Sequence, residues 1–98
     1  MIKVALPANL QALAGTGRMV DLEVSGPITQ RAILDALEER YPPLLGTIRD
    51  TRTKVRRPLL RFYACEEDYS DASPDEILPE EGAAGKEPFL IVGAIAGG

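Results

Sequence analysis

The chain of 98 residues ends in two glycines, Gly97 and Gly98, and a terminal glycine presents its α-carboxylate as a group on which chemistry can act. Glycine has no Cβ and accepts backbone conformations closed to other residues, so two in succession make a thin tail that can enter a narrow enzyme channel. Residues 94–98 reach about 17 Å when extended at about 3.3 Å each. The alternative interpretation is a frayed terminus, because chain ends often tolerate change.

The composition offers few groups for catalysis within the chain itself. Histidine is absent and Cys65 is the only cysteine, so the chain has no Ser/His pair, no Cys/His pair and no cluster of soft metal ligands. We therefore expect no metal site and no cofactor bound by this chain, and we expect a partner protein to supply any catalysis. With no histidine to activate it, Cys65 is expected to pack as a small hydrophobic residue.

Length and hydropathy indicate one small domain, residues 1–98. The chain is 45% hydrophobic and 27% charged, which is enough apolar material for a single core. A lone cysteine fits a reducing compartment. The N-terminal residues 2–7 lack the long apolar region of a signal peptide, and the apolar run 89–95 is far shorter than the roughly 20 residues that span a bilayer. We expect a soluble, cytoplasmic protein with no membrane partner.

Alternating apolar residues predict two strands near the N-terminus. Residues 2–6 and 20–24 both alternate with a period of two, which is typical of half-buried strands. We expect these strands to form a hairpin. In the long connection between them, Leu10 and Leu13 are expected to fold back onto the core, and residues 15–17 to reverse the chain.

A helix is predicted after Pro27. Thr29 can cap its first turn, Ile28 can pack against Ile33, and apolar residues recur at helical spacing. Pro42 and Pro43 then end the helix, because the residue before a proline is pushed out of the helical region. Four charged residues are expected on its solvated side: Asp35, Glu38, Glu39 and Arg40.

Three further strands are predicted in the second half of the chain. Residues 60–64 alternate as a third strand, and Tyr69 is expected in a short strand that follows it. The continuous apolar run 89–95 predicts a last strand at the centre of the sheet, covered on both faces. Between them, residues 73–76 resemble one helical turn, which directs Ile77 and Leu78 inward.

These elements occur in the order strand, strand, helix, strand, short elements, strand. One main helix then covers one face of a mixed sheet, which is an α+β arrangement. The order is that of the β-grasp, or ubiquitin-like, fold.

Charge is divided unevenly along the chain. Residues 49–61 hold six basic residues and one acidic residue, whereas residues 66–87 hold nine acidic residues and one basic residue. The two stretches are expected to attract one another or different partners. No recognition helix or aromatic-interleaved sheet motif accompanies the basic stretch, and the net charge is −4, so we expect no nucleic-acid partner.

The chain resembles the sulfur-carrier proteins of the MoaD/ThiS type, which include the small subunit of molybdopterin synthase, the thiamine-pathway carrier and a carrier that donates sulfur for cysteine synthesis. The resemblance covers nearly the whole chain and lies in residues 2–6, 10–15, 39–42, the third strand and 92–98. Two features depart from the family: Gly93-Ala94-Ile95 replaces a proline-containing approach to the final glycines, and residues 66–87 are longer than the compact turn of the smallest members.

The resemblance implies that an ATP-dependent, ubiquitin-activating-like adenylating enzyme activates the Gly98 carboxylate, and that sulfur then replaces AMP to give a thiocarboxylate. Gly98 is then the modified residue, Gly97 provides clearance, and Ile95 and Ala96 help to seat the tail in the partner's channel. ATP is used by the activating partner, and a synthase subunit accepts the sulfur. Molybdopterin synthesis is the favoured pathway, with cysteine or thiamine synthesis behind it.

Two other functions stay open. A protein modifier whose Gly98 is joined to lysines of its targets uses the same adenylation step. A non-catalytic β-grasp interaction module has an incidental diglycine. For the carrier, the sheet is expected to be a docking surface, with Phe62 as an apolar contact if it faces outward; its phase with Leu60 and Ala64 fits a core position at least as well.

Overall fold

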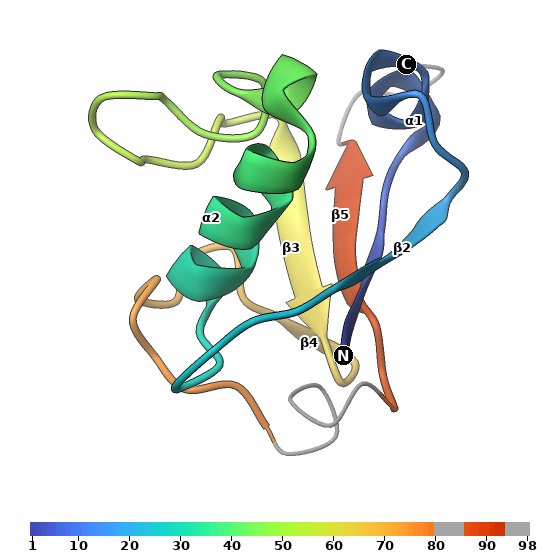
Figure 1. Cartoon of the computed structure of the whole chain (residues 1–98). Coiled ribbons are helices and arrows are strands. Elements are labelled where there is room, and N and C mark those ends of the chain that lie inside the picture. Colours follow the sequence, from blue (N-terminus) through green and yellow to red (C-terminus); the bar gives the residue numbers. More distant parts are fainter. Residues whose placement is uncertain (80–85, 94–98) are drawn as a thin grey trace.

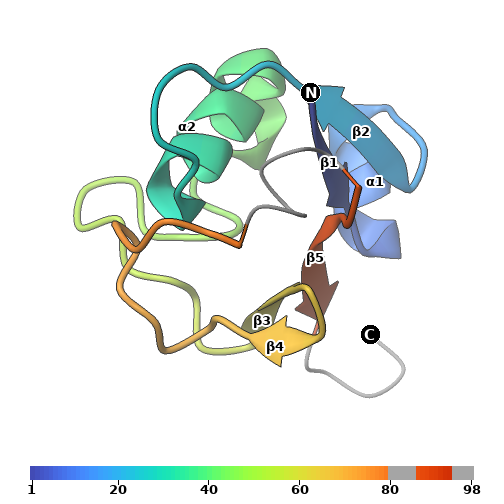
Figure 2. The same ribbon diagram turned by 90° about the horizontal axis from the view of Figure 1, so that it is seen from below.

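The computed structural model describes residues 1–79 and 86–93. Within these residues the chain forms a mixed sheet with the strand order β2-β1-β5-β3-β4. The strands are β1 (Ile2–Ala5), β2 (Met19–Leu22), β3 (Leu60–Ala64), β4 (Glu67–Asp68) and β5 (Phe89–Gly93), and the helices are α1 (Ala8–Ala14), α2 (Gln30–Arg40) and the 3₁₀ turn η1 (Pro42–Leu44). Figures 1 and 2 show that the sheet curves around one side of α2.

Strand β5 joins the two halves of the sheet. It pairs parallel with β1 on one side and antiparallel with β3 on the other, while β1 forms an antiparallel hairpin with β2. The predicted hairpin and the predicted central place of the last strand are therefore confirmed. One main helix packed on a mixed sheet with this strand order is the α+β, β-grasp arrangement that the element order predicts.

The core lies between α2 and the inner face of the sheet. Alternate residues of β1, β2, β3 and β5 point into it and meet the apolar side of the helix. They include Val4, Phe62, Phe89 and Ile91 from the sheet and Ile33, Leu34 and Leu37 from α2. The rings of Phe62 and Phe89 lie 5.5 Å apart in a tilted arrangement, a geometry that aromatic pairs favour. Phe62 is fully buried, so an outward-facing docking role for this residue is wrong.

The connection between β1 and β2 contains a helix that the sequence pattern does not reveal. Helix α1 buries Leu10 as expected, but Leu13 is 49% exposed and does not fold onto the core. The helix ends at Gly15, whose φ of 69° is left-handed and whose N–H donates to the carbonyl of Gln11. Glycine adopts this conformation without steric cost, so the predicted reversal at residues 15–17 begins with a helix cap.

Helix α2 begins and ends where the sequence predicts. The hydroxyl of Thr29 accepts a hydrogen bond of 3.1 Å from the N–H of Ala32, which satisfies a donor of the first turn. The two prolines after the helix form the turn η1, and Leu44 within it is buried.

The prediction that Glu38 lies on the solvated side of α2 is wrong. Glu38 is only 6% exposed, because it pairs with the buried guanidinium of Arg49. Arg49 donates from Nε to Glu38 Oε2 at 3.0 Å and from Nη2 to Oε1 at 2.9 Å, and Nη2 also donates to Asp35. Burial lowers the pKa of Arg49, but the hydrogen bonds to the two carboxylates outweigh it and raise the pKa above its ordinary value. This ion pair attaches the loop after η1 to the helix.

The β3–β4 connection is a tight turn in which Cys65 and Glu66 both have left-handed backbones, with φ of 51° and 68°. Cys65 is half-buried in this turn and does not pack inside a strand as predicted. Tyr69 directly follows β4 and is buried, and its N–H donates to the carbonyl of Phe62 at 2.7 Å. Tyr69 thus lies one residue beyond the short strand in which it is predicted to lie.

The segment before residue 80 was predicted to point two apolar side chains inward, and only one does so. Leu78 is buried, and its N–H donates to the carbonyl of Ile28 at 2.9 Å. Ile77 is 67% exposed. Adjacent residues of an extended segment point to opposite sides, which explains the difference.

Replacing Glu38 by glutamine is expected to lower the free energy of unfolding by about 2–4 kcal/mol, because the Arg49 guanidinium then stays buried with a single, exposed carboxylate partner. Asp35→Asn is the matched control, since it removes a carboxylate from the same guanidinium at a site that is 57% exposed. This control should cost less than about 1 kcal/mol. Urea unfolding at neutral pH measures both changes, and equal losses in the two variants would contradict the assignment.

Candidate functional site

The four residues assigned to the reactive tail, Gly98, Gly97, Ala96 and Ile95, lie outside the described residues. The structure follows the chain to Gly93, where β5 ends. The surroundings of this end of β5 define the part of the site that the structure describes.

The pairing register brings a row of side chains together on the sheet face away from α2. Met19 pairs with Ala5, Ala5 with Leu90, and Leu90 with Tyr63, so these four residues lie side by side across β2, β1, β5 and β3. Val92 follows Leu90 on the same face. We call these five residues the open face. Ala5 is buried within this row, and the other four side chains form a partly exposed apolar surface that reaches the end of β5.

The open face corrects one prediction about β5. A continuous apolar run predicts a strand covered on both faces, but Leu90 is only half-buried and Val92 is 40% exposed. Phe89 and Ile91, which point toward α2, are buried. The strand is central in the sheet, yet only its inner face is covered by the described residues.

Ion pairs flank the open face. Lys3 and Asp21 approach to 3.5 Å on one side, and Arg61 pairs with Asp68 on the other. Hydrogen bonds from Ser70 and from Arg61 lower the pKa of Asp68 to about 2, so this carboxylate stays ionised at neutral pH. An apolar centre with a charged rim is the usual composition of a protein interface.

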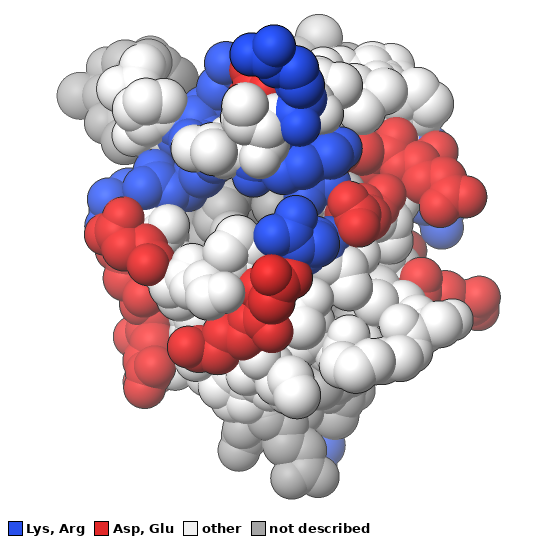
Figure 3. All heavy atoms as spheres, turned by 90° about the vertical axis from the view of Figure 1, so that its left-hand side faces the viewer, with Lys and Arg blue, Asp and Glu red and all other residues white. Residues whose placement is uncertain are grey.

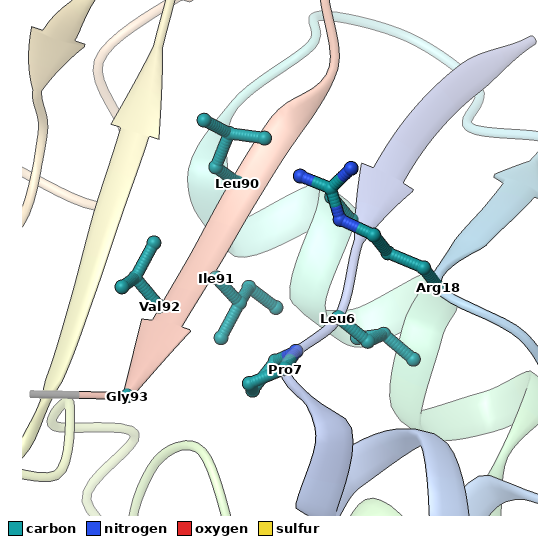
Figure 4. Close-up of a pocket in the computed structure, with 8 residues that line it drawn as sticks. Leu6, Pro7, Arg18, Leu90, Ile91, Val92 and Gly93 are labelled. Atoms are coloured by element: carbon teal, nitrogen blue, oxygen red, sulfur yellow. The ribbon is translucent and has the colours of Figure 1, made fainter. Parts of the chain in front are cut away.

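A pocket of about 280 Å³ lies where the open face meets the end of β5 (Figure 4). It is lined by the end of β1, the start of α1 and β5, together with Arg18. The Arg18 side chain extends from the start of β2 across β1 toward Leu90. The N–H of Leu6 donates to the Arg18 carbonyl at 2.8 Å, which fixes this residue at the end of the hairpin.

Arg18 gives this pocket its charge. The side chain is exposed and makes no ion pair with a described residue. A guanidinium beside an apolar surface can bind a carboxylate of a docking protein. Arg18 and the open-face residues could not be predicted as site residues, because the register that brings them to the end of β5 is not visible in a single sequence.

Among residues 1–79 and 86–93, no group of three or more His, Cys, Asp or Glu side chains is placed to hold a metal ion. Over the same ranges, no helix is long and apolar enough to cross a membrane.

No protein-family model matches the chain, and no curated protein matches it by sequence. Solved structures do match it. SAMP1 of Haloferax volcanii, a small archaeal modifier protein, has a TM-score of 0.75 at 24% identity, and the match covers 99% of this chain and 98% of that one. A chain of the BexX/CysO complex of Amycolatopsis orientalis has a TM-score of 0.74 at 20% identity, covering 100% of both chains.

CysO of Mycobacterium tuberculosis, described as an antigen, has a TM-score of 0.73 at 20% identity, covering 97% of this chain and 100% of that one. Identities of 20–24% establish the fold alone. The strand order, the single covering helix and these matches together show that this chain has the ubiquitin-like β-grasp fold.

Proposed function

We propose that this protein is a ubiquitin-like sulfur carrier, in which residues 1–93 form the body and residues 94–98 form a tail that ends in the reactive Gly98 carboxylate. The observation that supports this most strongly is the position of β5. Its C-terminal end lies beside the open face and Arg18, with the diglycine a few residues further along the chain. A partner that docks on this face therefore has the tail within reach of its active site.

The chemistry begins with activation, because an ionised carboxylate is a poor electrophile. Its reference pKa is about 3.5, so it is an anion at neutral pH. In the partner's site, a Gly98 carboxylate oxygen attacks the α-phosphorus of ATP, the bond to pyrophosphate breaks, and an acyl-adenylate forms. Sulfide then attacks the acyl carbon, AMP leaves, and Gly98 carries a thiocarboxylate. If a persulfide is the donor, it forms an acyl disulfide, which a thiol reduces to the thiocarboxylate.

The body of the protein contributes binding and not bond-making. Leu90 and Val92 supply apolar contact, and Arg18 supplies a charge that orients the partner. Gly97 lets the tail pass a narrow channel, while Ile95 and Ala96 seat it there. The BexX/CysO complex supports this assignment in one respect, since a protein of this fold forms a complex with a different protein.

Molybdopterin synthesis is the pathway we favour for the sulfur, on the strength of the sequence resemblance alone. A synthase subunit is then the acceptor of the sulfur from Gly98. Cysteine and thiamine synthesis are the alternatives, and they require the same activated tail.

Protein modification is a second candidate function. It is favoured by the similarity to SAMP1, which is named as a modifier protein. In that case a lysine amine of a target attacks the acyl carbon of the Gly98 adenylate, AMP leaves, and an amide bond forms in place of a thiocarboxylate. Conjugates on other proteins distinguish this function from sulfur transfer.

Gly97→Val is expected to lower tail adenylation by at least about tenfold, because a β-branched side chain obstructs a channel shaped for glycine. ATP–pyrophosphate exchange in an extract of the host measures this step. Gly97→Ala is the graded control and should lose less. The thermal unfolding midpoint should be the same in all three proteins. Full exchange activity in a well-folded Gly97→Val protein would count against a narrow channel.

Val92→Glu and Arg18→Glu are each expected to reduce the rate of tail activation at limiting protein by about tenfold, because they place a negative charge where a partner docks. Both residues are exposed, so stability should change by no more than about 0.5 kcal/mol. Ile77→Glu is the matched control: it is exposed, apolar and outside the open face. An equal effect of all three variants on pyrophosphate exchange would argue against docking through this face.

A further inference from the structure

A second pocket, of about 420 Å³, lies on a different side of the molecule from the open face. It is formed by the N-terminal end of α2, residues 53–56 and residues 70–74. Three basic side chains line it, Arg31, Lys54 and Arg56, against a single acidic one, Asp71. Figure 3 shows that Lys and Arg gather on this side of the protein. We call these three basic residues with Gln30 the cationic pocket.

Gln30 is the feature of this pocket that packing does not explain. Gln30 is 5% exposed, and its Oε1 is buried without a hydrogen-bond partner among the described residues. The amide nitrogen also makes no hydrogen bond to a described residue. Buried polar groups of proteins almost always have a partner. The oxygen is an acceptor that an anion does not satisfy, so what Gln30 offers an anion at the wall of the pocket is the unpaired NH₂ of its amide.

Two of the three cations are held in place by groups that leave room for an anion. Arg56 donates from Nε to the carbonyl of Ser70 at 3.0 Å and from Nη1 to the carbonyl of Leu60 at 2.6 Å, so its guanidinium is fixed before any ligand arrives. Its one carboxylate partner, Asp71 at 3.2 Å, is 83% exposed. Arg31 similarly pairs at 2.7 Å with Asp75, which is 68% exposed. Exposed pairs of this kind contribute little, so an entering anion can displace either carboxylate.

Lys54 is the third cation of the pocket. Its backbone is left-handed, with φ of 63°, and its N–H donates to the carbonyl of Asp50 at 2.8 Å. Its ammonium makes no ion pair with a described residue. This leaves one unpaired cation at the wall opposite α2.

Two backbone donors at the start of α2 already have partners within the protein, so we consider the side-chain donors. The N–H of Arg31 donates to the carbonyl of Pro74 at 3.0 Å, and the N–H of Ala32 donates to the hydroxyl of Thr29. These helix-end donors are therefore occupied. The available donors are the amide of Gln30, the ammonium of Lys54 and the two guanidinium groups.

We propose that the cationic pocket binds the phosphate group of a small molecule. Three cations around one concavity suit a compact, multiply charged oxyanion, and guanidinium groups bind phosphate oxygens in pairs. An acidic peptide is the less suitable ligand, because its carboxylates are spread along a chain, whereas the three cations surround one pocket. This site is separate from the tail and does not depend on the function proposed for Gly98.

The test is a titration of the ¹⁵N-labelled protein with sodium phosphate and with sodium pyrophosphate, followed by NMR, against sodium chloride at equal ionic strength. Saturable shifts are expected at the side-chain amide of Gln30 and at the backbone amides of Arg31 and Lys54. Shifts that do not saturate, or that match those in chloride, would overturn the proposal. Tighter binding of a hexaglutamate peptide at the same resonances would also overturn it, in favour of a protein partner.

Two variants make the test specific. Lys54→Gln should weaken phosphate binding by about tenfold, the usual effect of losing one charge-assisted hydrogen bond. Lys3→Gln, which removes the same charge on the other side of the molecule, should leave the affinity within about twofold. Equal losses in both variants would mean a general charge effect and no site.

The variant Gln30→Met distinguishes a role of Gln30 in phosphate binding from a role in the stability of the fold. It replaces the unpartnered amide by an apolar group of similar size, so the thermal unfolding midpoint should stay the same or rise while phosphate affinity falls. A lower midpoint with unchanged phosphate affinity would show that Gln30 is a structural residue, and it would contradict its assignment to the pocket.

Discussion

The parallel pairing of β1 with β5 is the contact on which the rest of the structure depends. It joins the first and last strands of the described chain, with Val4 opposite Phe89 and Ala5 opposite Leu90. Because the two strands run in the same direction, the C-terminal end of β5 lies beside the C-terminal end of β1. The β1–β2 hairpin returns to this point, and it brings Arg18 with it. A single pairing register therefore determines what surrounds the chain as it leaves the sheet.

This register also places the core residues and the exposed residues of β5 on opposite faces of the sheet. On β5, Phe89 and Ile91 enter the core while Leu90 and Val92 face outward, so one strand serves both purposes through the alternation of its side chains. Changes on the open face leave the core intact. A carrier needs this separation, because its partners must bind the outside of a fold that stays the same before and after the tail is loaded.

Ion pairs connect the basic and acidic stretches of the chain. The basic stretch 49–61 and the acidic stretch 66–87 do attract one another within the described residues, since Arg56 pairs with Asp71 and Arg61 with Asp68. The most buried cation, Arg49, turns instead toward α2 and Glu38. These contacts fold the long connections against the body of the protein. Of the cations without an ion pair to a described residue, Arg18 lies beside the open face and Lys54 lies at the cationic pocket.

Much of the fold is predictable because its signals are local. Alternation identifies the strands, Thr29 marks the start of α2, and the phase of Phe62 with its neighbours indicates a core position. Helix α1 is missed because it is short and buries only Leu10. The helical period of residues 8–14 is therefore too weak to distinguish this helix from a loop in the sequence.

The remaining errors involve partners that are distant in sequence. Glu38 looks like a solvated helix residue until the fold brings Arg49 to it. The outward side of β5 looks buried, because an apolar run cannot show how many faces of a strand are covered. The tail that we propose to be reactive, in contrast, is inferred from the sequence alone and lies outside the described residues.

The central claim is that Gly98 carries sulfur, and the intact mass of the protein tests it most directly. The protein is incubated with ATP, a sulfur source and an extract of its own host, beside a form that lacks Gly98. The account predicts a mass gain equal to the exchange of one oxygen for one sulfur in the full chain and no gain in the truncated form. An unchanged mass of the full chain, in an extract that supports adenylation of its tail, would contradict it.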